Sequence, residues 1–172
     1  VIKLIGRAKK YSDDKITATV GPCLIPNHSQ LSNVDDVFNA ILVRGDAIGD
    51  VVFYGRGAGK FPTASAVVAD IIDCARHNTK RRLFGWDCAE DNYVMDPLMA
   101  TSSLYVRAEA DDYVAAFNAI NSVFESPSIL HRDGESKNEI AFITPSMREK
   151  EARAAISKLP IKTELILRVM DY

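Results

Sequence analysis

The sequence of 172 residues has no long hydrophobic run, few cysteines and little net charge. No apolar stretch approaches the ~20 residues that a membrane-spanning helix requires, so no membrane partner is expected. Three cysteines, Cys23, Cys74 and Cys88, are far apart and form no CxxC pair. This pattern favours reduced thiols in a cytoplasmic protein over a disulfide framework or a zinc site.

Charge and histidine are also sparse. A net charge of −2 argues against nucleic acid as the main partner. The basic cluster Lys80-Arg81-Arg82 is short and is interpreted as an exposed linker. His28, His77 and His131 lack the spacing of metal ligands, so no metal site is expected.

The composition is that of a globular protein with a core, since 47% of the residues are hydrophobic and 26% are charged. The chain enters an apolar stretch, "VIKLIG", directly at Val1. We interpret this start as that of a piece whose upstream partner is missing.

The first half of the chain predicts two hairpins and a helix. Residues 1–26 alternate between apolar and polar side chains and predict two strands joined by a turn at 12–15. Apolar arms at 41–43 and 51–53 predict a second hairpin, in whose loop Asp46 is expected to stabilise the turn. Between the hairpins, residues 33–41 predict a short helical or turn segment with Asn33 as N-cap. A helix follows, with Pro62 at its first position, Arg76 near its end and an apolar face made by Ala64, Val67, Val68, Ile71 and Ala75.

The last third of the chain has another element order. Strands and helices are expected in the order βαββαβ, which is that of ferredoxin-like folds; the ranges are 102–110, 111–125, 128–132, 139–144, 145–159 and 163–172. The overall prediction is an α+β fold with a mixed or antiparallel sheet and a return helix, followed by this unit. The predicted domains are 1–77 and 101–172, joined by a connector at 78–100 in which Trp86 is expected to be a packing anchor.

Three glycines, Gly55, Gly57 and Gly59, alternate immediately before the predicted helix, in "YGRGAGKFP". The phosphate-binding P-loop motif GxxxxGK[ST] does not match here, because Tyr54 stands where its first glycine is required and Phe61 where its Ser or Thr is required. The dinucleotide fingerprint GxGxxG also fails, because Lys60 stands at its last glycine. A tight turn with positive φ needs only one glycine, so the alternation favours a ligand or another domain packing on this backbone.

The stretch "LSNVDDVFNAILVRGDAIGDVVFYGRGAGKFPTASAVVADII" resembles homoserine dehydrogenases, in the latter part of their catalytic region. The family carries L-x-N-V-x-G-x-F-N-A-I, G-D-x-x-G, Y-G-x-G-A-G and P-T-A-S-A-V-V-x-D-I segments; Asp36 replaces a usual glycine. The resemblance implies an oxidoreductase that uses NADP or NAD to interconvert L-homoserine and L-aspartate 4-semialdehyde, in threonine, methionine and isoleucine biosynthesis.

Carried over by position, the resemblance implies that Gly59, with Gly57 and Ala58 beside it, contacts the nicotinamide end of the cofactor. The family's Rossmann fingerprint, catalytic lysine and homoserine-binding carboxylates all fall upstream of Val1. No catalytic residue is therefore expected in this chain, Lys60 included. The isolated chain is expected to be inactive and to need the upstream portion of the enzyme as its partner.

Residues 101–172 stand where many members of the family carry an ACT domain, which binds amino acids. The family's ligand turn reads D-x-P-G-V, and here Val114 and Ala115 replace its proline and glycine. This change disfavours a threonine effector and favours a dimerising role. Two hypotheses remain: part of the enzyme, or a stand-alone regulatory or assembly module for dimerisation or amino-acid sensing. Either predicts a homo-oligomer.

Overall fold

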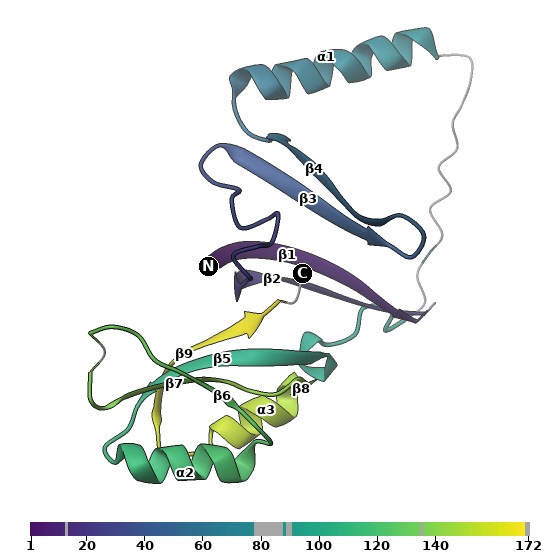
Figure 1. The fold of residues 1–172 in the computed structure, drawn as a ribbon. Helices are drawn as coiled ribbons and strands as arrows, with labels where there is room; N and C mark the ends of the chain where they lie inside the picture. Colours follow the sequence, from purple (N-terminus) through teal and green to yellow (C-terminus); the bar gives the residue numbers. More distant parts are fainter. Residues whose placement is uncertain (13, 78–87, 89–90, 135, 171–172) are drawn as a thin grey trace. The chain divides into compact units, whose positions relative to one another are not determined.

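The computed structural model describes residues 1–12, 14–77, 88, 91–134 and 136–170 (Figure 1). The chain divides into two compact units, one made of 1–27 with 89–172 and one of 28–88. This division cuts across the predicted ranges 1–77, 78–100 and 101–172. The basic cluster at 80–82 and Trp86 lie outside the described residues.

The first unit is built on a mixed sheet with the strand order β1-β2-β9-β5-β7-β6, in agreement with the predicted α+β class (Figure 1). Strand β2 runs parallel to β9, whereas the other neighbours are antiparallel. The strands are β1 (Ile2–Ser12), β2 (Lys15–Leu24), β5 (Thr101–Glu109), β6 (Ser128–Leu130), β7 (Glu139–Ile143) and β9 (Lys162–Val169). A short β8 (Met147–Arg148) pairs with the start of β5.

Helices α2 (Tyr113–Val123) and α3 (Glu149–Ile156) cover one face of the part of this sheet that β5, β6, β7 and β9 form (Figure 1). Alternate residues of β5 point into the core between sheet and helices, as the twofold period of a strand dictates. The core residues are Leu104, Val106, Ala108, Ala110, Ala116, Ile120, Phe124, Ile140, Phe142, Ala152, Ile156 and Leu159. Helix α2 begins after Asp112, whose carboxylate accepts a hydrogen bond from the Ala115 N–H at 3.0 Å.

The predicted start of the last helix, at Pro145 or Ser146, is wrong. Met147 and Arg148 instead continue the sheet as β8 opposite Ser102 and Thr101. The Glu149 N–H then donates to the Ala100 carbonyl at 3.0 Å. Pairing with a distant strand therefore delays the helix by a few residues.

The β1–β2 hairpin forms as predicted, but it buries its threonine face. Thr17 is 6% exposed, whereas Val20 on the opposite face is 78% exposed and lies beside the similarly exposed Leu4. Residues 93–95 pair with Ile16 through the Met95 N–H and the Tyr93 carbonyl. A 3-10 turn, η1 (Pro97–Met99), follows. The described part of the predicted connector thus packs on β2.

The second unit contains β3 (Phe38–Gly45), β4 (Gly49–Arg56) and α1 (Lys60–Arg76). The hairpin pairs Leu42 with Val52, as the two apolar arms predict, and Asp46 accepts from the Ala47 N–H in the loop. The prediction for 33–41 is wrong in part: turns occupy its start, Asn33 caps no helix among the described residues, and β3 begins at Phe38. Asp36 has φ 61°, a left-handed conformation that aspartate tolerates in place of glycine.

Helix α1 begins two residues earlier than predicted, so Pro62 takes its third position. The first four N–H groups of a helix have no partner within it, so proline is tolerated there too. Arg76 lies in the last turn, as predicted. Among the described residues of this helix none is buried, and Val67, Val68 and Ile71 are 53%, 52% and 61% exposed. The helix therefore presents an uncovered apolar face.

Candidate functional site: the glycine corner

Residues 57–59 form the corner between the end of β4 and the start of α1. This corner and its flanks, from 53 to 61, are exposed. The structure therefore places the predicted site residues Gly57, Ala58 and Gly59 together on an open stretch of backbone. The three alternating glycines in this region have three different environments.

Gly59 is required by backbone conformation. Its φ is 123°, in the region that residues with a Cβ rarely adopt, and it occupies the N-cap of α1. Its carbonyl accepts the Thr63 N–H at 3.1 Å, the first hydrogen bond of the helix. A Cβ here would come no closer than 3.5 Å to Pro62, so conformation rather than space excludes a larger residue.

Gly57 has a close neighbour inside the chain, the exposed and flexible side chain of Asn39. A Cβ at this position would clash with the side-chain amide of Asn39. Gly55 differs from both, because among the described residues no heavy atom lies within 4 Å of a Cβ built on it, and its φ is not left-handed. Only Gly55 therefore has no explanation in the fold of the described residues.

Aromatic and basic side chains flank the corner. The rings of Phe38 and Tyr54 stack with centroids 5.0 Å apart and planes 8° apart, and the Arg56 guanidinium lies 5.4 Å from the Phe38 centroid. The Lys60 ammonium lies 6.0 Å from the Phe61 ring. Glycine at the N-cap has no side chain to occupy the free N–H groups of α1, and its first turn, fully described, has no acidic residue. The corner can therefore receive a flat ring or an anionic group.

Sequence reasoning missed Asn39 and the aromatic stack. Both follow from the hairpin register, in which Asn39 lies opposite Gly55 and Phe38 opposite Arg56. Asn39 is therefore the diagonal neighbour of Gly57, and Phe38 is the diagonal neighbour of Tyr54. Counting outward from the loop at Gly45 and Gly49 would have found these pairs. Lys60, which was not expected to be catalytic, is exposed.

The thiols and acidic side chains of the described ranges form no second site. Cys23, Cys74 and Cys88 are free thiols, and only Cys23 is buried. No group of three or more histidine, cysteine or acidic side chains in these ranges could hold a metal ion. No helix among the described residues is long and apolar enough to cross a membrane.

Comparison with known proteins points to one family. The homoserine dehydrogenase family model matches residues 1–72. Homoserine dehydrogenases of Neisseria gonorrhoeae and Helicobacter pylori are each 35% identical to this chain over 92% of its length, which is 39% of theirs. A crystal structure of homoserine dehydrogenase from Thiobacillus denitrificans matches 99% of the chain with a TM-score of 0.79 and 33% identity.

The matched region is only 42% of the Thiobacillus denitrificans chain. A homoserine dehydrogenase structure from S. aureus at pH 7.5 gives the same coverage, with a TM-score of 0.74 and 28% identity. The chain thus spans about two fifths of the length of these relatives and corresponds to their C-terminal part. The agreement in sequence and structure extends over nearly the whole chain, and the chain belongs to the homoserine dehydrogenase family.

Proposed function

We propose that this chain supplies the latter part of the catalytic region of an enzyme that interconverts L-homoserine and L-aspartate 4-semialdehyde with NAD or NADP. The supporting observation is the coverage of the relatives, whose further length holds the remainder of the enzyme. The isolated chain is inactive in this proposal. A stand-alone regulatory module is less well supported, because every relative named above is a longer dehydrogenase.

Within that enzyme, the corner at Gly57, Ala58 and Gly59 lies against the nicotinamide. The observation that carries this assignment is the exposed backbone at 57–59, which leads into an uncapped helix N-terminus. A planar ring approaches peptide groups closely only where no long side chain stands between them. This chain's part is to position the ring, and the cofactor when bound supplies the hydride chemistry.

The test is Ala58→Leu in the full-length enzyme that includes this chain. We expect the Michaelis constant for the cofactor to rise at least about tenfold, because the larger side chain would occupy the ring's position. Ala47→Leu is the matched control, since Ala47 is also exposed but lies in the β3–β4 loop. Cofactor binding measured by fluorescence should change in parallel, while the melting temperature stays constant in both variants.

Gly55→Ala adds a second arm to this test. Its new methyl group meets open space in the described structure, so any loss of cofactor affinity identifies a neighbour from outside the described residues. Unchanged cofactor affinity in both Ala58→Leu and Gly55→Ala would overturn the assignment of the corner.

Residues 101–172 serve in our proposal as an ACT-like assembly module rather than as a threonine sensor. The observed order β5-α2-β6-β7-β8-α3-β9, which is βαββαβ apart from the two-residue β8, supports the ACT-like assignment. At the turn before α2, the Asp112 carboxylate already accepts the Ala115 N–H that a ligand carboxylate would need. The uncovered apolar side chains of β1, β2 and α1 support assembly with the upstream portion and with a second copy.

A further inference from the structure

Asn39 is the one polar side chain on its face of the β3–β4 hairpin, both strands of which are fully described. Strand residues alternate between two faces and paired residues share a face, so Asn39 lies on the same side as its partner Gly55. The other side chains of this face are apolar, namely Ile41, Val43, Val51 and Phe53, and its remaining positions are glycines. A single amide beside exposed apolar surface is typical of a ligand site, where few polar groups fix the orientation of the bound molecule.

The Asn39 amide lies against the glycine corner. A Cβ built on Gly57 would overlap the Asn39 Nδ2 atom and would lie 2.8 Å from its Cγ atom, so the amide occupies the space of the missing side chain. At Gly55, directly opposite Asn39, a Cβ would meet no described atom within 4 Å. The hairpin therefore presents bare backbone with an amide beside it, and such a surface fits a flat ring that carries a polar substituent.

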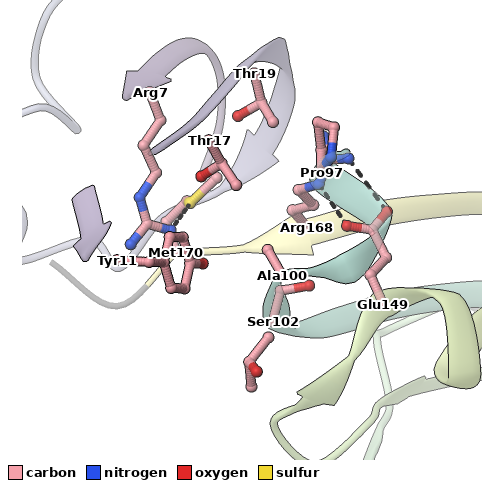
Figure 2. Close-up of a pocket in the computed structure, with 11 residues that line it drawn as sticks. Arg7, Tyr11, Thr17, Thr19, Pro97, Ala100, Ser102, Glu149, Arg168 and Met170 are labelled. Atoms are coloured by element: carbon pink, nitrogen blue, oxygen red, sulfur yellow. Dashed lines mark hydrogen bonds and ion pairs between the residues drawn. The ribbon is translucent and has the colours of Figure 1, made fainter. Parts of the chain in front are cut away.

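The hydrogen-bonding groups of the Asn39 side chain are not used within the described residues, since none of these residues forms a hydrogen bond with the amide. Glu149 in the other unit is a contrasting case, because its carboxylate accepts from Arg168 at 2.7 and 3.2 Å (Figure 2). The Asn39 amide thus has a carbonyl acceptor and two N–H donors for a molecule outside the described chain.

We propose that Asn39 is a positioning residue for the nicotinamide and acts through the carboxamide of the ring. This inference rests on our proposal that the ring lies against the corner at 57–59. Two primary amides pair head to tail, because each can donate an N–H to the carbonyl of the other. The carboxamide is attached next to the ring carbon that carries the hydride. A side chain that pairs with it therefore sets the rotation of the ring in its plane.

The experiment compares two cofactors in the full-length enzyme that includes this chain, namely its preferred nicotinamide dinucleotide and the 3-acetylpyridine analogue. The analogue keeps the exocyclic carbonyl but has a methyl group in place of the amide NH₂. Dissociation constants are measured by calorimetry without homoserine, so the readout is independent of turnover. We expect the wild type to bind the natural cofactor about three- to tenfold more tightly, which corresponds to one neutral hydrogen bond.

Variants assign this preference to Asn39. Asn39→Leu has a similar size but no hydrogen-bonding group, so the ratio of the two dissociation constants should fall to about one. Gly57→Ala should also lower the ratio, because the new methyl group displaces the amide. The matched control is Asn118→Leu, since Asn118 is exposed as well but lies in α2 of the other unit, and it should leave the ratio unchanged.

Asn39→Asp serves if the leucine variant does not fold. Aspartate keeps an acceptor for the amide NH₂ but has no donor for the carbonyl that both cofactors carry. It should therefore weaken both cofactors and retain the preference for the natural one. Loss of the preference in this variant would contradict the proposed pairing.

A wild-type preference that persists in Asn39→Leu would overturn the inference, as would the absence of any preference in the wild type. Ala58→Leu separates these outcomes from a failure of the proposed function, because a leucine in the ring's position weakens both cofactors however the ring is oriented. Weaker binding in Ala58→Leu with an unchanged ratio in Asn39→Leu would overturn only the role of Asn39. Unchanged binding in Ala58→Leu and Gly55→Ala would overturn the corner itself and this inference with it.

Discussion

Replacing Glu149 with glutamine removes a buried negative charge that ties the first residue of α3 to β9. Glu149 is 1% exposed. One carboxylate oxygen accepts from Arg153 Nε at 2.8 Å and Arg168 Nη2 at 3.2 Å, and the other accepts from Arg168 Nε at 2.7 Å. Glutamine has the same shape but only one acceptor oxygen and no charge. The variant therefore tests the ion pairs with little change in packing.

The expected loss lies between the values for buried and surface ion pairs. Removing one partner of a fully buried pair costs about 3–5 kcal/mol, whereas exposed pairs contribute about 0.2–1 kcal/mol. The side chains of Arg168 and Arg153 are 24% and 40% exposed, so water still solvates both guanidinium groups. We therefore expect Glu149→Gln to lower the free energy of unfolding by about 2 kcal/mol. For a chain of this size the melting temperature should fall by about 4–8 °C.

Urea unfolding followed by circular dichroism measures this difference directly. The control is Glu151→Gln in the same helix, because the Glu151 side chain is 55% exposed and forms an exposed ion pair with Arg148. It should cost less than about 1 kcal/mol. A loss below about 0.5 kcal/mol for Glu149→Gln, equal to that of the control, would refute the reasoning, because it would show that burial adds nothing to the pair.

Two further predictions concern residues 101–172. Calorimetric titration of the chain with millimolar threonine should give no heat of binding, because Asp112 occupies the Ala115 N–H; saturable heat would show an effector site at variance with our proposal. The hydrogen bond from Arg132 lowers the pKa of Glu139 below its ordinary value. The ionised carboxylate therefore stabilises the fold at pH values above its unfolded-state pKa. This stabilisation is lost as the pH falls through the lower pKa of the folded state. Arg132→Gln should therefore lower the melting temperature at pH 7 and lower it by less and less as the pH falls through the acid range, whereas the exposed Lys137→Gln should have no effect at either end. A difference that stays the same from pH 7 down to the lowest pH at which the protein folds would count against the ion pair.

Alternation and helical spacing predicted the element types, because both signals are local. The β3–β4 hairpin is one example: its loop glycines and apolar arms fix the pairing of Leu42 with Val52 within a few residues. The start of α3 could not be found in this way. Met147 is held in β8 by Ser102, a residue far away in the sequence, and a local pattern contains no record of that partner.

Burial was less predictable than element type. Strand β2 alternates as expected, yet Thr17 is buried and Val20 is exposed. The same inversion affects α1, where the apolar stripe containing Val67 and Ile71 is uncovered. A periodic pattern indicates that one face needs a cover, but it does not indicate which polypeptide supplies it. Because the chain spans about two fifths of its relatives, these faces fit our proposal of assembly with the rest of the enzyme.

The glycine corner shows how one sequence pattern can have several physical causes. The alternation at 55, 57 and 59 favours a ligand or another domain packed against this backbone. In the structure, a positive φ accounts for Gly59, and the exposed Asn39 side chain would have to move to admit a Cβ at position 57. Neither glycine by itself therefore argues for a cofactor. Gly55 has no such cause among the described residues, because a methyl group there would contact none of them and the strand conformation permits any residue. Our proposal of a ring at this corner therefore rests on the exposed backbone at 57–59, and Ala58→Leu and Gly55→Ala are the two changes that test it.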